Sequence, residues 1–509
     1  MTSPASDPAA ETDPLAETDP LAETYDVIVL GGGPAGENAA DYAVRGSSRT
    51  AAIIEAELLG GECSYWACIP SKALLRPLDV AETAANLAPL SVPTLDRDAL
   101  LARRDDWVAH YDDSGQVRWA ESAGLTMVRG HGRLVGERTL EVVDAGGAVQ
   151  RLTARTAVVL ATGSAPVIPD TLASVRPWTT RDVTGVVEVP GRLAIVGGGV
   201  AACEAARWMT ALGSHVTLLV RGERLLGRLE DFAGEEVAEG LRSAGVTVRF
   251  GTSVTRAVRD RVEHDPAEHH PAEHHPADPR ATVGRPHGGP ITLTLDDGTA
   301  PDGEGAGSEE LEVDELVVAA GRHPRTDIGL EAIGLDPADL RGRTHGGPLP
   351  EWLFTVGDVN GEAMLTHWGK YQARVVGRRI AALAEGRPVP DEVPAPVPQV
   401  IFSAPQVAAV GLTSRGAAEA GQTVRLLDAD YTSAAGAGLL RDDAAGHARL
   451  VLDADTEVLL GATFVGPEVA ELLHSATVAI AGSLDLATLR RAVPSYPTAS
   501  EVWLRLLEQ

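Results

Sequence analysis

The chain has 509 residues, of which 44% are hydrophobic, and a formal net charge of −29 from 43 basic and 72 acidic side chains. This length and apolar content indicate a soluble globular protein of several domains. The negative charge repels phosphate backbones and anionic lipid, so we expect neither nucleic acid nor a membrane surface as a partner. No run of about 18 apolar residues is present, which excludes a membrane-spanning helix. The acidic start lacks a secretory signal, so we expect a cytoplasmic protein.

Cysteine and lysine are both rare in this chain. The three cysteines, Cys63, Cys68 and Cys203, are too few for the disulfide framework of a secreted protein. Only two of the 43 basic residues are lysines, Lys72 and Lys370. Mutational bias explains most of this scarcity, but a lysine that persists against the bias is a candidate for a role that arginine cannot fill. Lys72 follows Cys68 by four positions.

The first ordered elements in chain order predict a dinucleotide site. An apolar strand at 25–30 runs into the sequence GGGPAG and then into a helical stretch. In this context Gly31 allows the tight turn, Gly33 lets a pyrophosphate approach the backbone, and Gly36 lets helix and strand pack closely. Glu55 ends the next apolar strand, at the distance expected for an acid that holds the ribose hydroxyls.

The same pattern returns in the middle of the chain. A second apolar strand leads into Gly197 and Gly199, and Ala202 takes the place of the third glycine, which the motif permits. The following strand ends at Arg221 rather than at an acid. Because arginine attracts a 2′-phosphate, we predict that this site prefers NADPH over NADH. Arg224 either assists or is a solvated surface residue.

Low-complexity segments interrupt these patterns. Residues 11–22 repeat ETDPLA twice, and residues 1–24 as a whole predict a disordered tail. Residues 263–290 are rich in proline and histidine, lie between the two strands of a predicted hairpin, and have no fixed geometry for a metal, so we predict a surface loop and no metal site. Its repeats carry His264, His269, His270, His274 and His275. Residues 297–309 separate that hairpin from the next strand, and residues 385–398 form a proline-rich linker.

Cys63 and Cys68 are separated by four residues, between the first glycine motif and a helical stretch. Positions five apart on a regular helix lie about 8 Å apart, whereas a disulfide needs Cα atoms within roughly 7 Å. A bridge between them therefore requires a distorted segment, and in a cytoplasmic protein it would be catalytic. The alternative is two unrelated buried thiols.

The sequence GGECSYWACIPSKALL around these cysteines resembles the redox motif of class I flavin disulfide reductases, which include dihydrolipoyl dehydrogenase, glutathione reductase and mercuric reductase. Further segments similar to this family are ATGSAP at 161–166, AGRHP at 320–324, TVGDV at 355–359, and the stretches 401–413 and 461–476. The resemblance covers about residues 25–507. It implies an α/β fold with two Rossmann-like dinucleotide-binding domains and a C-terminal α+β dimerisation domain. The implied boundaries are 25–184 for the FAD domain, 185–316 for the NAD(P) domain, 317–396 for a second FAD-contact segment with the linker, and 397–509 for dimerisation.

The resemblance also implies the roles of single residues. Cys63 would be the interchange thiol that attacks the substrate, and Cys68 would face the flavin as a thiolate in a charge-transfer pair. Lys72 would lie near the flavin N5, paired with Glu204, where a compact ammonium differs from an arginine fork. Cys203 is expected to be a packing residue. Residues expected to contact the cofactors are Thr162, Gly163, Gly321, Gly357 and Asp358, together with those of the two glycine motifs.

The C-terminal stretch departs from the lipoamide and glutathione reductases. Their acid–base histidine, which the partner subunit contributes, is replaced here by Tyr496, while the glutamate that orients it remains as Glu501. Deprotonating a dithiol near neutral pH needs a base with a pKa near 7, and a phenol with a pKa of about 10 is a poor one. Mercuric reductases also carry tyrosine here, but this chain lacks their C-terminal cysteine pair.

These observations predict a homodimeric FAD enzyme that oxidises NADPH or NADH and passes electrons through a Cys63–Cys68 disulfide to a small acceptor. The acceptor is a quinone, a small disulfide or a metal ion. One alternative is a dihydrolipoyl dehydrogenase in which Tyr496 or solvent handles the proton. An alternative of another class is a non-catalytic flavin sensor or a metal-binding protein that uses the histidine-rich loop.

Overall fold

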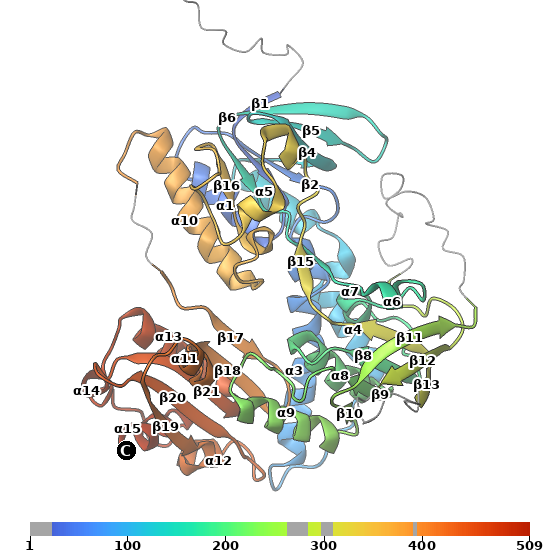
Figure 1. The fold of residues 1–509 in the computed structure, drawn as a ribbon, viewed down its shortest axis with the longest axis vertical. Helices are drawn as coiled ribbons and strands as arrows, with labels where there is room; N and C mark the ends of the chain where they lie inside the picture. The colour runs from blue at the N-terminus through green and yellow to red at the C-terminus, as the bar shows by residue number, and fades with distance from the viewer. Residues whose placement is uncertain (1–22, 262–282, 297–308, 390–393) are drawn as a thin grey trace, which may run out of the picture.

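The computed structural model describes residues 23–261, 283–296, 309–389 and 394–509 (Figure 1). The expected tail up to residue 22 and the histidine-rich repeat lie outside these residues, as do parts of the two other low-complexity stretches. Within the described residues no helix is long and apolar enough to cross a membrane.

The N-terminal domain is built on a seven-stranded sheet. A continuous apolar run from Val27 to Leu30 is almost wholly buried, as expected for a central parallel strand covered on both faces. The first strand begins at Glu23, two residues before the predicted start, because Glu23 and Thr24 pair with residues 152 and 153 of the long strand β6. In sheet order the strands are β3 (Leu125–Arg129), β2 (Ala51–Glu55), β1 (Glu23–Leu30), β6 (Val149–Leu160), β5 (Thr139–Val143) and β4 (His131–Gly136), with β16 (Leu353–Thr355) paired to the end of β6.

Helices flank this sheet and lead away from it. They are α1 (Pro34–Val44), α2 (Gly61–Tyr65), α3 (Cys68–Ala85), α4 (Arg97–Trp107), α5 (Ser114–Ser122), α6 (Asp170–Ala173), α7 (Thr180–Thr184) and α10 (Thr366–Ala384). The long helix α10 returns from far along the chain to lie beside α1 (Figure 1). A Cβ at Gly377 would lie 2.6 Å from the Cβ of Tyr42, so glycine permits this close approach of the two helices.

The middle of the chain forms a four-stranded parallel sheet and a separate antiparallel sheet. The parallel strands are β10 (Thr247–Arg249), β9 (His215–Leu219), β8 (Arg192–Val196) and β14 (Glu315–Val318), with helices α8 (Val200–Leu212) and α9 (Asp231–Ser243). The antiparallel strands are β11 (Ser253–Arg259), β12 (Ile291–Asp296) and β13 (Glu309–Val313). The pairing of β11 with β12 confirms the predicted hairpin. A short two-stranded ladder of β7 (Ser164–Pro166) and β15 (Arg322–Pro324) joins the middle of the chain to the first domain.

The C-terminal domain is a five-stranded antiparallel sheet covered by short helices, as the predicted α+β class requires. Its strands in order are β17 (Pro398–Ile401), β18 (Gln406–Gly411), β21 (Leu459–Gly466), β20 (His447–Asp453) and β19 (Val424–Asp430). Its helices are α11 (Ser414–Glu419), α12 (Ala435–Gly438), α13 (Leu473–Ala481), α14 (Leu486–Leu489) and α15 (Val502–Leu507). Tyr431, Phe464 and Trp503 belong to its apolar core.

Breaking one ion pair should destabilise the middle domain. Arg259 and Glu315 have fully buried side chains 2.6 Å apart. Replacing Arg259 with Met leaves the carboxylate buried without its cation, which should lower the free energy of unfolding by about 3–5 kcal/mol. Arg133→Met, which breaks the exposed pair with Glu331, should cost less than about 1 kcal/mol. Urea unfolding of both variants measures the difference, and equal losses would contradict the expectation.

Candidate active site

The first glycine motif forms an open cradle between β1 and α1. Gly31 has φ +107°, and a Cβ there would overlap the carbonyl oxygen of Ala161, so the turn requires glycine. Gly33 caps the start of α1, and the nearest atom to a Cβ placed on it is the Cα of Gly61 at 3.9 Å. Helix N–H groups therefore face open space at a positive dipole end, the arrangement that binds a pyrophosphate.

Glu55 lies at the end of β2 against this cradle. Its carboxylate accepts the backbone N–H of Gly32 at 2.8 Å and that of Glu57 at 2.8 Å. Burial raises the pKa of Glu55, and the two N–H donors counteract part of that rise. The acid is thus fixed beside the glycine turn, at the position where a bound dinucleotide would present its ribose.

The second motif repeats this geometry between β8 and α8. Gly197 has φ +136°, and a Cβ there would overlap the carbonyl oxygen of Ala319. Gly199 caps α8 with no atom within 4 Å of a Cβ, and Ala202 is fully buried. Arg221 follows β9 and is exposed, while Arg224 forms an ion pair with Asp231. The structure places Arg224 in a surface ion pair, and its assistance at the dinucleotide stays a prediction.

Cys63 and Cys68 lie on two different helices. α2 ends at Tyr65 and α3 begins at Cys68, while the intervening Trp66 and Ala67 have the non-helical φ values −130° and −138°. This break is the distortion that the spacing of the pair requires. Both cysteines are free thiols, and each shifts the pKa of the other.

The two thiols differ in acidity. The hydrogen bond from Cys63, with support from Thr366 and Lys72, lowers the pKa of Cys68 to about 6 although burial and Glu204 oppose this. Donating that hydrogen bond, together with burial, raises the pKa of Cys63. The Oγ1 atom of Thr366, the first residue of α10, lies 3.3 Å from the Sγ atom of Cys68. The directions of the two shifts favour negative charge on Cys68 over Cys63.

Lys72 and Glu204 meet beside Cys68. The Lys72 Nζ lies 2.6 Å from Oε2 of Glu204, whose side chain is buried on α8. The other carboxylate oxygen accepts the backbone N–H of Phe402 at 3.0 Å, and the ammonium lies 4.9 Å from the centre of the Phe402 ring. Cys203, the neighbour of Glu204, is fully buried in the apolar core, where burial raises its pKa to about 12.

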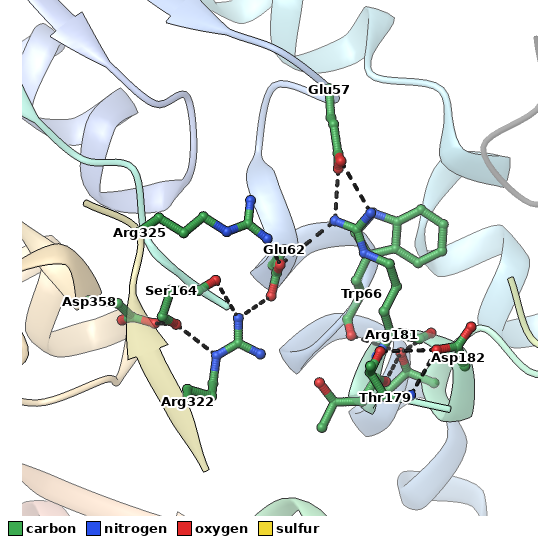
Figure 2. A network of polar contacts seen from close by, with 12 residues as sticks. Glu57, Glu62, Trp66, Ser164, Thr179, Arg181, Asp182, Arg322, Arg325 and Asp358 are labelled. Atoms are coloured by element: carbon green, nitrogen blue, oxygen red, sulfur yellow. Dashed lines mark hydrogen bonds and ion pairs between the residues drawn. The ribbon is translucent and has the colours of Figure 1, made fainter. Parts of the chain in front are cut away.

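Asp358 and the residue before Cys63 are linked by one polar network (Figure 2). Ser164 donates to Asp358 at 2.5 Å and accepts from Arg322 at 2.7 Å. Arg322 also donates to Glu62 at 2.6 Å, and Arg325 donates to the same carboxylate at 3.0 Å. Burial raises the pKa of Asp358 against the effects of Ser164 and Arg322. The network connects the second expected FAD motif to the start of the cysteine loop.

Arg181 extends the network to the loop between the cysteines. Its guanidinium donates to Glu57 at 2.8 Å, lies 3.7 Å from Glu62, and lies 5.0 Å from the centre of the Trp66 ring (Figure 2). The capping box of α7, in which Thr179 and Asp182 cap each other, fixes the helix that carries Arg181.

One cavity of about 1180 Å³ connects these features. Its walls include the first cradle, the start of α8 at Val200 and Ala201, the two cysteines, both lysines and the polar network. The glycines of the second motif, Gly197 and Gly199, do not line it. Predicted residues that line it are Gly31, Gly33, Glu55, Cys63, Cys68, Lys72, Thr162, Gly163, Glu204, Gly357 and Asp358. An open cradle, an acid for ribose and a buried carboxyl at Asp358 in one continuous cavity fit an extended dinucleotide such as FAD. Among the described residues no group of three His, Cys, Asp or Glu side chains could hold a metal ion.

Comparison with known proteins identifies the family. Residues 25–373 match the model of the pyridine nucleotide-disulphide oxidoreductases, and residues 397–506 match the dimerisation domain of the same proteins. The chain belongs to this family. Its predicted enzyme class and its two cofactors, FAD and NAD(P)H, are thereby confirmed, and the chain is a flavin disulfide oxidoreductase.

Several members of the family are similar along almost their whole length. Dihydrolipoyl dehydrogenase 3 of Pseudomonas aeruginosa is 30% identical over 491 residues, which cover 94% of this chain and 96% of the relative. Glutathione reductase of Burkholderia cepacia is 28% identical, with 95% and 98% covered. The fold matches LpdA from Mycobacterium tuberculosis, with a TM-score of 0.77 at 20% identity and 96% and 99% covered. It also matches the Cu(II) complex of the HOCl-induced flavoprotein disulfide reductase RclA from Escherichia coli, with a TM-score of 0.75 at 21% identity and the same coverage.

The C-terminal pair lies apart from the cysteines of its own chain. Tyr496 is 78% exposed, Glu501 is 6% exposed, and neither lines the cavity. The Oε2 atom of Glu501 is enclosed and has no hydrogen-bond partner among the described residues. Within one chain, therefore, these two predicted residues do not join the site.

Several residues of the site received no role from the sequence, among them Thr366, Lys370 and the charged members of the polar network other than Asp358. Thr366 stands 298 positions from Cys68 in a stretch without a distinctive motif, so no sequence signal marks it. Lys370 lines the cavity together with Lys72, and the rarity of lysine that singled out Lys72 would have found it.

Removing the Thr366 hydroxyl should weaken the thiolate of Cys68. Hydrogen bonds to charged groups contribute about 1.5–3 kcal/mol, so Thr366→Val should raise the pKa of Cys68 by about one unit. Thr366→Ser, which keeps the hydroxyl, should stay close to the parent enzyme. The ultraviolet absorbance of the thiolate, followed against pH in the reduced enzyme, reports the value. Superimposable titrations for Val and parent would show that the contact has no electrostatic effect.

Proposed function

We propose that this protein is a homodimeric NAD(P)H oxidoreductase in which the Cys63–Cys68 pair delivers electrons to a small acceptor. The proposal rests mainly on one cavity that holds the two thiols together with the first cradle, which suits FAD, and with the start of α8, the helix that follows the second glycine motif. Bound FAD would supply the two-electron exchange between a nicotinamide and a disulfide.

The chain's own groups divide the work on the sulfur atoms. Cys68 keeps its negative charge near neutral pH, because Cys63 and Thr366 donate to it and Lys72 lies nearby. Cys63 would make the bond to an acceptor and then lose it as the disulfide with Cys68 re-forms. Lys72, which forms an ion pair with Glu204, would stabilise the negative charge on Cys68.

The proposed dimer is supported by the match to the dimerisation domain and by the exposure of one segment. Val493 and Tyr496, between α14 and α15, are 85% and 78% exposed. Large exposed apolar side chains in one segment are typical of a surface that a second subunit covers. We propose that this segment meets the site of the other copy, so that Tyr496 and Glu501 act there.

The nature of the acceptor follows from Tyr496. With Tyr496 in the place of the acid–base histidine, the site lacks the group that would deprotonate dihydrolipoamide or protonate a glutathione leaving group. We therefore propose an acceptor such as a quinone, a small reactive disulfide or a metal ion. Copper(II) is a useful metal probe because the RclA structure is a Cu(II) complex.

Two alternatives have observable signatures. A dihydrolipoyl dehydrogenase, as some relatives are named, would show robust lipoamide-dependent NAD reduction. A flavin sensor or metal-binding protein would show no acceptor turnover, and deletion of residues 263–290 would abolish its metal binding. In our proposal that deletion changes turnover little. An acceptor screen with NADPH and NADH separates the three, and a purified protein without flavin would contradict the main proposal.

Removing one thiol should separate the two halves of the reaction. Cys68→Ser prevents disulfide formation, so thiol-dependent turnover should fall by at least about a hundredfold while NAD(P)H still bleaches the flavin. Stopped-flow flavin absorbance and steady-state acceptor assays measure the two halves. Cys203→Ser is the matched control, because Cys203 is buried in the core, and it should retain turnover. Unchanged acceptor turnover in Cys68→Ser would exclude the thiol route.

The nicotinamide preference should follow the charge at Arg221. The parent enzyme should have the higher kcat/KM with NADPH, and Arg221→Glu should shift the NADPH to NADH ratio toward NADH by about tenfold or more, because the new carboxylate repels a 2′-phosphate. Arg224→Gln should shift the ratio less, because Asp231 already engages Arg224. A tenfold NADH preference in the parent enzyme would overturn the assignment.

A further inference from the structure

The two lysines of this chain both lie at the redox pair. Lys72 follows Cys68 by one turn of α3, and Lys370 lies one turn after Thr366 on α10. Because residues four apart share a helix face, the contact of Thr366 with Cys68 places Lys370 on the face of α10 that meets the cysteines. Both lysines line the same cavity as Cys63 and Cys68. All other basic side chains except histidine are arginines, so the presence of both lysines in one cavity calls for an explanation.

The two ammonium groups have different electrostatic partners. Lys72 is neutralised by Glu204 and acts on Cys68. Lys370 is exposed, and its ammonium has no hydrogen bond or ion pair among the residues that the structure describes. Its charge lowers the pKa of Cys63, opposing the larger upward effects of Cys68 and burial. The cation of Lys370 is therefore free to act on the interchange thiol.

Glu37 faces Lys370 from the neighbouring helix. It lies in the first turn of α1, and its Oε1 atom is enclosed without a hydrogen-bond partner. Burial raises the pKa of Glu37 to about 7, and the charge of Lys370 counteracts part of that rise. The packing of α1 against α10 thus brings the carboxyl of Glu37 within electrostatic reach of the Lys370 ammonium.

We propose that Lys370 is a positioning residue whose positive charge stabilises the thiolate of Cys63 during exchange with the acceptor, and that Glu37 moderates this charge. The inference rests on the proposed function, since it assigns Cys63 the exchange step. Lys370 would supply, without accepting a proton, the positive charge that an imidazolium would otherwise place near the interchange sulfur. A compact ammonium on a flexible stem suits this task better than a planar guanidinium, which favours forked hydrogen bonds.

Charged and titratable groups of several elements line the cavity that contains Cys63. They are Glu62 on its own helix, Cys68 and Lys72 on α3, His367 and Lys370 on α10, Glu204 on α8 and His474 on α13. Glu62 is engaged by Arg322 and Arg325, and Glu204 is engaged by Lys72. His367 contacts the carbonyl oxygen of Pro398. Lys370 acts directly on Cys63, and Glu37 on α1 acts on Lys370.

Alkylation of Cys63 tests the proposal in the NADPH-reduced holoenzyme. The rate of reaction with iodoacetamide follows the thiolate fraction, and mass spectrometry of the Cys63 peptide measures it from mildly acidic to mildly alkaline pH. Lys370→Met should slow alkylation at neutral pH by about three- to tenfold and move the profile to higher pH. Lys370→Arg should restore most of the rate. Glu37→Gln should move the profile the opposite way, because it removes the opposing negative charge.

Arg374→Gln is the matched control, because Arg374 is exposed one turn further along α10 and should leave the profile unchanged. A Lys370→Met profile identical to that of the parent, or equal slowing in Lys370→Arg, would overturn the role of charge. Flavin content and flavin bleaching by NADPH should stay at parental values in Arg374→Gln, because Arg374 does not line the cavity. If NADPH fails to expose Cys63 to alkylation in the parent enzyme, the proposed function itself fails. If NADPH exposes Cys63 to alkylation in the parent enzyme but Lys370→Met leaves the alkylation rate unchanged, only the role of Lys370 is refuted.

Discussion

The ion pair between Lys72 and Glu204 is the contact on which the arrangement of the site depends. Glu204 is buried on α8, and a buried carboxylate without a cation is strongly destabilising. Its two oxygens accept from Lys72 on α3 and from the backbone of Phe402. The carboxylate of Glu204 therefore links three parts of the chain. It connects α8 of the middle domain to α3 of the N-terminal domain, and to the loop that follows β17 in the C-terminal domain.

A second pairing between the same helices repeats this design. Arg207, three residues after Glu204 on α8, donates to Asp79 at 2.5 Å and to Glu82 at 2.8 Å on α3. Arg441 of the C-terminal domain also donates to Glu82, at 2.7 Å. Because acid and base alternate between the two helices, α3 cannot slide against α8 without leaving buried charges unpaired. The start of α3, and with it Cys68, is thereby held between the two glycine cradles.

The sequence predicts features that depend on neighbouring residues. It does not predict contacts between side chains that lie far apart along the chain. The glycine turns, Glu55 and the β11–β12 hairpin follow from strand and turn patterns within a few dozen residues, and the Lys72–Glu204 contact followed from the family resemblance. The contacts of Thr366 with Cys68 and of Arg322 with Glu62 join residues 298 and 260 positions apart. No periodicity encodes such pairs, because they depend on how α10 and β15 pack against the cysteine loop. Arg224 was ambiguous because only the folded chain reveals the carboxylate of Asp231 beside it.

The replacement of the family's acid–base histidine by Tyr496 agrees with the arrangement of charged groups around Cys63 and Cys68. An imidazole would accept a proton from a substrate thiol, whereas the groups that surround this pair mainly stabilise negative charge on sulfur. Thr366 and Lys72 favour the thiolate of Cys68, and Lys370 favours that of Cys63. These directions support the proposed class of acceptor, which takes electrons from a thiolate without first giving up a proton. Dihydrolipoamide is instead an electron donor, and it must be deprotonated before it can reduce a disulfide.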